Sequence, residues 1–122
     1  MKSVKEFSFP DKNDPLEKVI ETKVCTYAKK RGFLAYKFVS PNNRGVPDRI
    51  FISPEGSVFF IEFKRKGRKP TKLQHEIITR LQKHNAFVDV VDNIEDGKEF
   101  IDKVLYAELC GLKVLPKRHT DI

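Results

Sequence analysis

The stretch that decides the fold is Asp48-Arg49-Ile50-Phe51-Ile52-Ser53-Pro54-Glu55-Gly56-Ser57-Val58-Phe59-Phe60-Ile61-Glu62-Phe63-Lys64. Its two halves are rich in β-branched and aromatic residues, which predicts two strands. The residues between them, Pro54-Glu55-Gly56, have the composition of a turn. A three-residue loop would set Ser53 opposite Ser57 in an antiparallel pair. The same register would set Asp48 opposite Glu62, with Cβ atoms about 5 Å apart.

Charged side chains would therefore gather at the open end of this hairpin. Lys64 shares a face with Glu62, because side chains two apart on a strand point the same way. Two nearby carboxylates repel each other unless a cation offsets them, and Mg²⁺ typically takes one or two carboxylates while keeping water ligands. Such an ion lowers the pKa of a bound water and stabilises a phosphate under attack. A metal-dependent nuclease is one interpretation. A surface hairpin with a solvated Glu62–Lys64 pair, worth very little energy, fits the spacing equally well.

The composition limits the other possibilities. The 122 residues suit one domain with a single core, and 39% hydrophobic content with ten Phe indicates a globular chain. A net charge of +7 points to a polyanionic partner, either nucleic acid or an anionic membrane surface. No apolar run approaches the ~20 residues of a membrane span, and the N-terminus lacks an apolar signal core. Two distant cysteines do not suggest a disulfide framework. We therefore expect a cytoplasmic protein.

The rest of the chain predicts an α/β fold with a mixed β-sheet flanked by helices. The expected elements are a helix starting at Asp14-Pro15 and ending at Gly32, a strand over 33–39, the hairpin, a helix from Thr71, a strand over 86–91, and a helix from Asn93 to about Leu109. Gly97 is unfavourable inside the last helix. The helix from Thr71 can act as a crossover, which would make the last strand parallel to its neighbour. We expect a lead-in at 1–13, a domain at 14–110 and a tail at 111–122.

Several further residues are candidates for the site. The Phe63 carbonyl would supply a third metal ligand. Glu21 borders the apolar stripe of the first helix and could reach the metal or its water, although an ordinary solvated glutamate has the same pattern. Gln74 stands three residues after Thr71, so a capping box explains it, while its amide could also lie near the scissile phosphate. Lys64 would neutralise charge on the phosphate or deprotonate the water. The ordinary lysine pKa of ~10.4 favours the electrostatic role.

A dense run of cations follows Glu62, with six Lys or Arg among residues 64–72. Such a run is either a solvated charge cluster or a contact to the phosphate backbone, which positions a substrate without reading its sequence. Polar residues in the 40–47 loop could flank the substrate or simply form a turn. The residues expected to contact DNA are Lys37, Asn43, Arg44, Arg65, Lys66, Arg68, Lys69 and Lys72. The three histidines have no metal-ligand spacing, and the sequence has no Walker or dinucleotide motif.

Four segments together resemble one known family. They are Tyr36-Lys37-Phe38-Val39-Ser40-Pro41, Arg44-Gly45-Val46-Pro47-Asp48-Arg49, Phe60-Ile61-Glu62-Phe63-Lys64, and Gln74. The chain resembles a stand-alone VRR-NUC (virus-type replication-repair nuclease) domain of the PD-(D/E)xK superfamily, as carried by many bacteriophages. The resemblance covers roughly residues 17–92. It implies a restriction-endonuclease-like α/β core and Mg²⁺- or Mn²⁺-dependent phosphodiester hydrolysis.

The resemblance also implies roles for individual residues. Asp48 matches the acid of the family's Gly-x-Pro-Asp motif, and Glu62 and Lys64 match its Glu-x-Lys motif. Glu21 falls at the family's first-helix acid, which implies a catalytic and metal-binding role. Gln74 matches the glutamine that opens the family's next helix. Members that stand alone resemble Holliday-junction resolvases and are expected to be homodimers.

We therefore expect a DNA endonuclease acting on branched DNA as a homodimer, most simply a Holliday-junction resolvase. A flap, nicking or restriction-type nuclease with the same site is an alternative. A non-catalytic nucleic-acid-binding module is a second alternative, which the presence of all the charged site residues disfavours. We expect neither a nucleotide cofactor nor a membrane partner, because the sequence has no phosphate-binding loop and no basic amphipathic helix.

Overall fold

The computed structural model describes residues 14–112. The elements, in chain order, are α1 (Glu17–Lys30), β1 (Leu34–Lys37), β2 (Arg49–Ile52), β3 (Val58–Phe63), α2 (Lys72–Lys83), β4 (Val88–Val91) and α3 (Ile94–Leu109). This is the predicted order of helix, three strands, helix, strand and helix. The expected lead-in at 1–13 and nearly all of the expected tail lie outside the described residues. Among the described helices, none is long and apolar enough to cross a membrane.

The four strands form one mixed sheet in the order β1-β2-β3-β4. The first three strands are antiparallel, whereas β4 runs parallel to β3 after the α2 crossover. In the hairpin, Ile52 pairs with Val58, and the Ser53 N–H donates to the Ser57 carbonyl at 2.8 Å. The predicted register is therefore confirmed. Extended by one residue beyond the Arg49–Ile61 pair, it sets Asp48 opposite Glu62.

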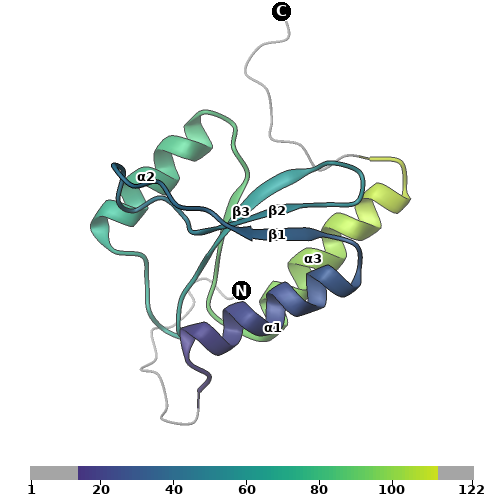
Figure 1. Cartoon of the computed structure of the whole chain (residues 1–122), viewed down its shortest axis with the longest axis horizontal. Coiled ribbons are helices and arrows are strands. Elements are labelled where there is room, and N and C mark those ends of the chain that lie inside the picture. Colours follow the sequence, from purple (N-terminus) through teal and green to yellow (C-terminus); the bar gives the residue numbers. More distant parts are fainter. Residues whose placement is uncertain (1–13, 113–122) are drawn as a thin grey trace, which may run out of the picture.

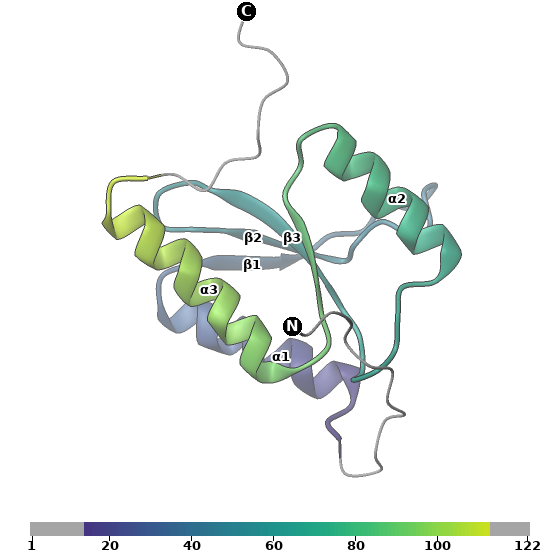
Figure 2. The same ribbon diagram turned by 180° about the vertical axis from the view of Figure 1, so that it is seen from behind.

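The hydrophobic core lies on one face of the sheet. There α1 and α3 pack side by side, while α2 lies apart from them at the other end of the sheet (Figures 1 and 2). Alternate residues of β3, namely Phe59, Ile61 and Phe63, join this core. The residues between and after them, Phe60, Glu62 and Lys64, consequently belong to the opposite face. Glu62 and Lys64, two residues of the candidate site, thus lie on the face that α1 and α3 leave uncovered.

Gly97 has a packing reason that outweighs its low helix propensity. A Cβ atom at this position would lie 2.4 Å from Cγ2 of Val24 and 3.3 Å from Cγ1 of Val91. Both valines are nearly fully buried. Only a glycine therefore lets α3 approach α1 this closely.

Two of the three helix starts are as predicted. Thr71 and Gln74 form a complete capping box at the start of α2, and the Asn93 side chain caps α3. The predicted start of α1 at Asp14-Pro15 is wrong. Leu16 is the N-cap, with an extended backbone (φ −68°, ψ 157°) and no side-chain cap. The helix therefore begins at Glu17, one residue after this N-cap.

The turn of the hairpin is fastened to the end of α3. The hydroxyls of Ser53 and Ser57 both donate to Oε2 of Glu108, the second over 2.7 Å. The Glu55 N–H donates to Oε1 of the same carboxylate at 3.3 Å. Both serines are buried, so Glu108 satisfies hydroxyl groups that would otherwise be costly to bury.

Candidate active site

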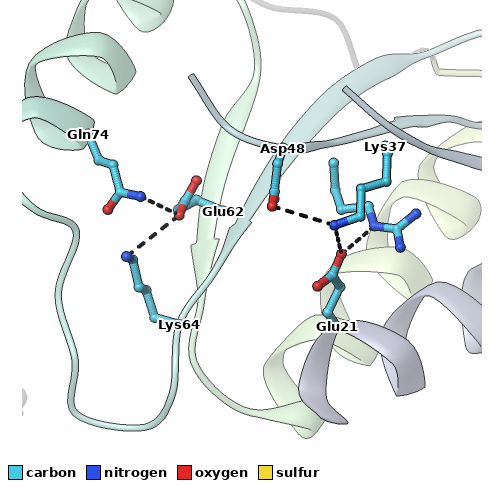
Figure 3. Close-up of polar contacts among 7 residues, drawn as sticks. Glu21, Lys37, Asp48, Glu62, Lys64 and Gln74 are labelled. Atoms are coloured by element: carbon cyan, nitrogen blue, oxygen red, sulfur yellow. Dashed lines mark hydrogen bonds and ion pairs between the residues drawn. The ribbon is translucent and has the colours of Figure 1, made fainter. Parts of the chain in front are cut away.

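Glu62 is the centre of the first group of charged side chains. It is only 5% exposed. Its Oε2 accepts a 3.0 Å hydrogen bond from Nε2 of Gln74 and lies 3.7 Å from Nζ of Lys64 (Figure 3). Burial raises the pKa of the Glu62 carboxyl to about 7, Lys64 opposes this rise, and the Asp48 carboxylate adds to it. Further positive charge beside Glu62 would therefore be favourable.

Glu21 is the centre of a second group. This α1 residue is also 5% exposed. Its Oε2 accepts a hydrogen bond from Nε of Arg49 at 2.5 Å and lies 3.8 Å from Nζ of Lys37. The structure thus pairs Glu21 with two cations, Lys37 of β1 and Arg49 of β2.

Asp48 lies between the two groups (Figure 3). Nζ of Lys37 is 4.0 Å from Oδ2 of Asp48, so one ammonium contacts both Asp48 and Glu21. The Asp48 side chain is about half exposed, unlike the buried Glu62. Its carbonyl accepts a 2.9 Å hydrogen bond from the Phe38 N–H, which ties it to the end of β1. Asp48 is therefore the acid of the site that solvent reaches most easily.

The loop before Asp48 packs against α2. Gly45 has φ +88°, a conformation that favours glycine. A Cβ atom there would lie 3.0 Å from Cγ of Leu73 and 3.2 Å from Cγ1 of Ile77. Pro47 is buried. Gly45 and Pro47 thus fix the path of the chain that leads to Asp48. This explains why a glycine and a proline precede the acid in the Gly-Val-Pro-Asp run.

The Phe63 carbonyl faces the Asp48 side of β3. The Lys64 N–H donates to the Val91 carbonyl of β4 at 2.9 Å, and backbone groups of consecutive strand residues point to opposite sides. The groups of Phe63 therefore point toward β2. Extending the hairpin register sets Pro47 opposite Phe63, and proline has no N–H to donate. This carbonyl is thus suited to another partner, in line with the predicted ligand role.

The donor set fits a hard divalent cation. Asp48, Glu62 and the Phe63 carbonyl offer oxygen atoms, which suit Mg²⁺ or Mn²⁺. A dication would also offset the buried charge of Glu62. Glu21 could join only if Arg49 and Lys37 gave way. Within residues 14–112, no group of three or more His, Cys, Asp or Glu side chains is arranged to hold a metal ion. The remaining ligands would therefore be main-chain oxygen, water or substrate.

The predicted DNA contacts surround these acids. Arg65, Arg68 and Lys69 line a hollow of about 420 Å³ together with Lys64 and with Lys18 of α1. Asn43 lines a second hollow, of about 340 Å³, beside α2. Arg44, Lys66 and Lys72 are exposed, and Lys37 is held by the acids. The candidate contacts thus lie on both sides of the acids.

Comparisons with known proteins agree with this geometry. The chain is 43% identical over 77 residues to a protein named “Putative nuclease p44” of Acyrthosiphon pisum secondary endosymbiont phage 1, covering 63% of this chain and 83% of that protein. A solved structure described as “VRR_NUC domain” superposes with a TM-score of 0.66 at 26% identity, covering 70% of this chain and 94% of that one. This chain belongs to the VRR-NUC family. No family model matches the sequence.

The VRR-NUC fold brings in residues that the sequence analysis did not assign to the site. Arg49 is one of them. The sequence did contain a signal for it, because strand alternation places this charged side chain on the core face of β2. Lys18 is another, one turn before Glu21 on α1. Phe38 is the third, because its N–H holds the Asp48 backbone.

Proposed function

We propose that this VRR-NUC protein is a metal-dependent endonuclease that hydrolyses phosphodiester bonds in branched DNA. A Holliday junction is the first candidate substrate, and a homodimer is the proposed active form. The observation that carries the proposal is the group of Glu62, Lys64 and Gln74 beside Asp48 at the open end of the hairpin. The net charge of +7 supports a polyanionic substrate.

Each residue has a chemical task in this proposal. Asp48, Glu62 and the Phe63 carbonyl would hold Mg²⁺ or Mn²⁺, with Glu21 as a further acid. The bound ion would supply an activated water and polarise the phosphate. Lys64 would stabilise the negative charge that develops on the phosphate, or else deprotonate the water. Gln74 would keep the Glu62 carboxylate oriented through its hydrogen bond.

The homodimer follows from the substrate. A two-fold axis places equivalent sites on two strands, so two copies would cut a four-way junction symmetrically. Sedimentation at micromolar concentration tests this part of the proposal. A dimer is expected, and a monomer throughout would exclude paired cutting by a preformed dimer. The expected location in the host-cell cytoplasm stays a prediction.

Cleavage assays on end-labelled DNAs test the activity. The panel is a four-way junction, a flap, a fork, a linear duplex and a single strand, each with Mg²⁺, with Mn²⁺ or with EDTA. Paired symmetric nicks in the junction, only with metal, are the expected result. Cleavage of flaps or duplex instead would keep the chemistry and discard the junction role. Tight binding without any cleavage would indicate a non-catalytic module.

Three variants connect that activity to the site. Asp48→Asn and Glu62→Gln are expected to abolish cleavage while DNA binding in EDTA changes little. Glu55→Gln is the matched control, because this acid is exposed at the other end of the same hairpin. Normal cleavage by both site variants would show that the acids have been assigned wrongly.

A further inference from the structure

A second hollow lies beside the acids, and the proposed chemistry leaves it without a task. Its volume is about 340 Å³, and it opens between the 38–46 segment, β3 and α2. Its main lining residues are Phe38, Phe60, Ile77, Leu81, Arg80 and His84. Four of these six side chains are apolar. We refer to this hollow as the aromatic pocket.

Two phenylalanines form one wall of the aromatic pocket. The rings of Phe38 and Phe60 are 5.6 Å apart between centroids, at an interplanar angle of 75°. Phe38 is 37% exposed, and Phe60 is partly buried. On the opposite side, Ile77 and Leu81 of α2 are only partly covered. These two apolar side chains of α2 therefore face an open hollow.

The aromatic pocket adjoins two of the proposed metal ligands, Asp48 and Glu62. The Phe38 N–H donates to the Asp48 carbonyl at 2.9 Å. Phe60 precedes Glu62 by two residues of β3, so the two share a face about 7 Å apart along the strand. Any group held against the two rings would therefore lie about one nucleotide from the acids.

The opposite side of the acids has a different character. Lys64, two residues beyond Glu62 on the same face of β3, lines the basic hollow with Arg65, Arg68 and Lys69. Along β3, Phe60 borders the aromatic pocket, Glu62 belongs to the acids, and Lys64 borders the basic hollow. Cations suit phosphates, whereas aromatic rings suit nucleobases. Arg80 and His84 on the pocket rim add polar groups that could meet the edge of a base or the next phosphate.

We propose that the aromatic pocket binds one unpaired nucleobase of the DNA strand whose backbone passes over Asp48 and Glu62. This inference rests on the proposed function, and it adds a structural basis for substrate choice. A base in an intact duplex is stacked between its neighbours and must be extruded to enter such a pocket. A base at a branch or an end is already freed from part of that stacking. The aromatic pocket would thereby favour branched DNA over continuous duplex.

The test compares matched DNAs and matched variants in EDTA, so that binding is measured without cleavage. One DNA carries a single unpaired base at a branch, and the other has an abasic site at the same position. The wild-type protein is expected to bind the first roughly fivefold or more tightly, as base–aromatic stacking predicts. Phe38→Ala is expected to bind both DNAs equally. Tyr36→Ala, an exposed aromatic on β1 outside the pocket, is expected to behave like wild type.

A second variant separates recognition from folding. Phe38→Leu keeps an apolar side chain against Phe60 but removes the flat ring, so it should unfold at the wild-type temperature and still lose the preference for the base. Three results would overturn the proposal. The first is equal binding of both DNAs by the wild type, and the second is loss of the preference in Tyr36→Ala as well. The third is a Phe38→Leu protein that changes from dimer to monomer and binds both DNAs more weakly. The last result would make the pocket a contact between subunits.

Failure of this inference is distinguishable from failure of the proposed function. A wild-type protein that cuts DNA with Mg²⁺ but ignores the unpaired base would refute only the aromatic pocket. A protein that prefers the base but never cuts DNA would refute only the nuclease proposal.

Discussion

The Nε2 atom of Gln74 donates a 3.0 Å hydrogen bond to Glu62, while Oε1 of the same amide accepts one of 2.9 Å from the Thr71 N–H. One side chain thus closes the capping box of α2 and contacts the buried acid of β3. The orientation of Glu62 therefore depends on where α2 begins. The cap interpretation and the site interpretation of Gln74 are compatible.

Two variants separate the two tasks of Gln74. Thr71→Ala removes only the cap, so it should cost about 1 kcal/mol of stability and leave cleavage nearly unchanged. Gln74→Glu keeps an acceptor for the Thr71 N–H but sets a carboxylate beside Glu62, so cleavage should fall about 10- to 100-fold. Urea unfolding and initial cleavage rates measure the two effects. Equal losses of cleavage in both variants would mean that Gln74 acts through the cap alone.

The raised pKa of Glu62 predicts a pH-dependent stability for the metal-free protein. The unfolded chain releases this proton near the ordinary value of 4.5, whereas the folded protein keeps it until about pH 7. Stability should therefore decline as the pH rises from about 4.5 to 7, by roughly 3 kcal/mol at 1.36 kcal/mol per pH unit. Urea unfolding in EDTA at pH 5 and pH 8 measures this decline. The Glu62→Gln protein cannot ionise at this position, so its stability should lack this decline. An equal decline in both proteins would show that Glu62 is not its cause.

Metal addition should reverse the decline. At pH 8, Mg²⁺ would bind the folded state and raise the stability of the wild-type protein, because a ligand that prefers the folded state stabilises it. The Glu62→Gln protein should respond much less. If Mg²⁺ stabilised both proteins equally, Glu62 would not be a ligand.

The pair of Glu21 and Arg49 should be important for folding. Arg49→Met would leave a buried carboxylate with only the 3.8 Å contact to Lys37, so we expect a loss of about 3 kcal/mol. Adding Glu21→Gln should restore much of it. The matched control is Arg31→Met, which removes an exposed partner of Asp102 at 3.7 Å and should cost less than about 1 kcal/mol. Equal losses of stability in Arg49→Met and Arg31→Met would show that the Glu21–Arg49 pair is as solvent-exposed as the surface pair.

The cations after Glu62 should control the salt dependence of DNA binding. Replacing Lys66, Arg68 and Lys69 by Gln should reduce the slope of log K against log salt concentration by ~0.9 for each lost phosphate contact on duplex DNA. The control replaces Lys29 and Lys30 in the last turn of α1 together with Lys98 of α3, which matches the change in net charge. An equal change of slope in both triple variants would indicate that only net charge matters.

Gly97 offers a test of the helix packing beneath Glu21. Gly97→Ala gains about 1 kcal/mol of helix propensity but forces a methyl group against Val24, and such overpacking costs about 1–3 kcal/mol. We expect a net loss in the wild-type background. In a Val24→Ala background the same change should be neutral or stabilising. An equal cost in both backgrounds, measured by urea unfolding, would refute the contact.

The local patterns that proved reliable were those in which neighbouring residues determine the geometry. The hairpin register followed from the Pro54-Glu55-Gly56 turn, since a fixed loop length leaves one pairing. The start of α2 followed from Thr71 and Gln74, because a capping box closes within one turn of helix. The predicted start of α1 was wrong. Asp14-Pro15 has the composition of a helix start, but the backbone becomes helical only after Leu16.

Features that depend on distant residues could not be predicted in the same way. The pairing of Glu21 with Arg49 joins residues 28 positions apart, and no local pattern specifies it. Gly97 looked unfavourable because its benefit arises only when α3 meets Val24 of α1. Ile77 and Leu81 lie on an apolar stripe of α2 at helical spacing, yet they border a pocket. Periodicity identifies an apolar face without identifying what covers it.

The placement of Asp48 and Glu62 depends on Glu108, because this residue of α3 holds the turn at the far end of their hairpin. A slip of one residue between β2 and β3 would turn Asp48 or Glu62 toward the wrong face, and it would also separate the two serine hydroxyls that share the Glu108 carboxylate. A substitution at Glu108 would therefore reduce DNA cleavage, although this residue does not contact the substrate. A mutational scan scored by DNA cleavage should rank this position near the acids themselves.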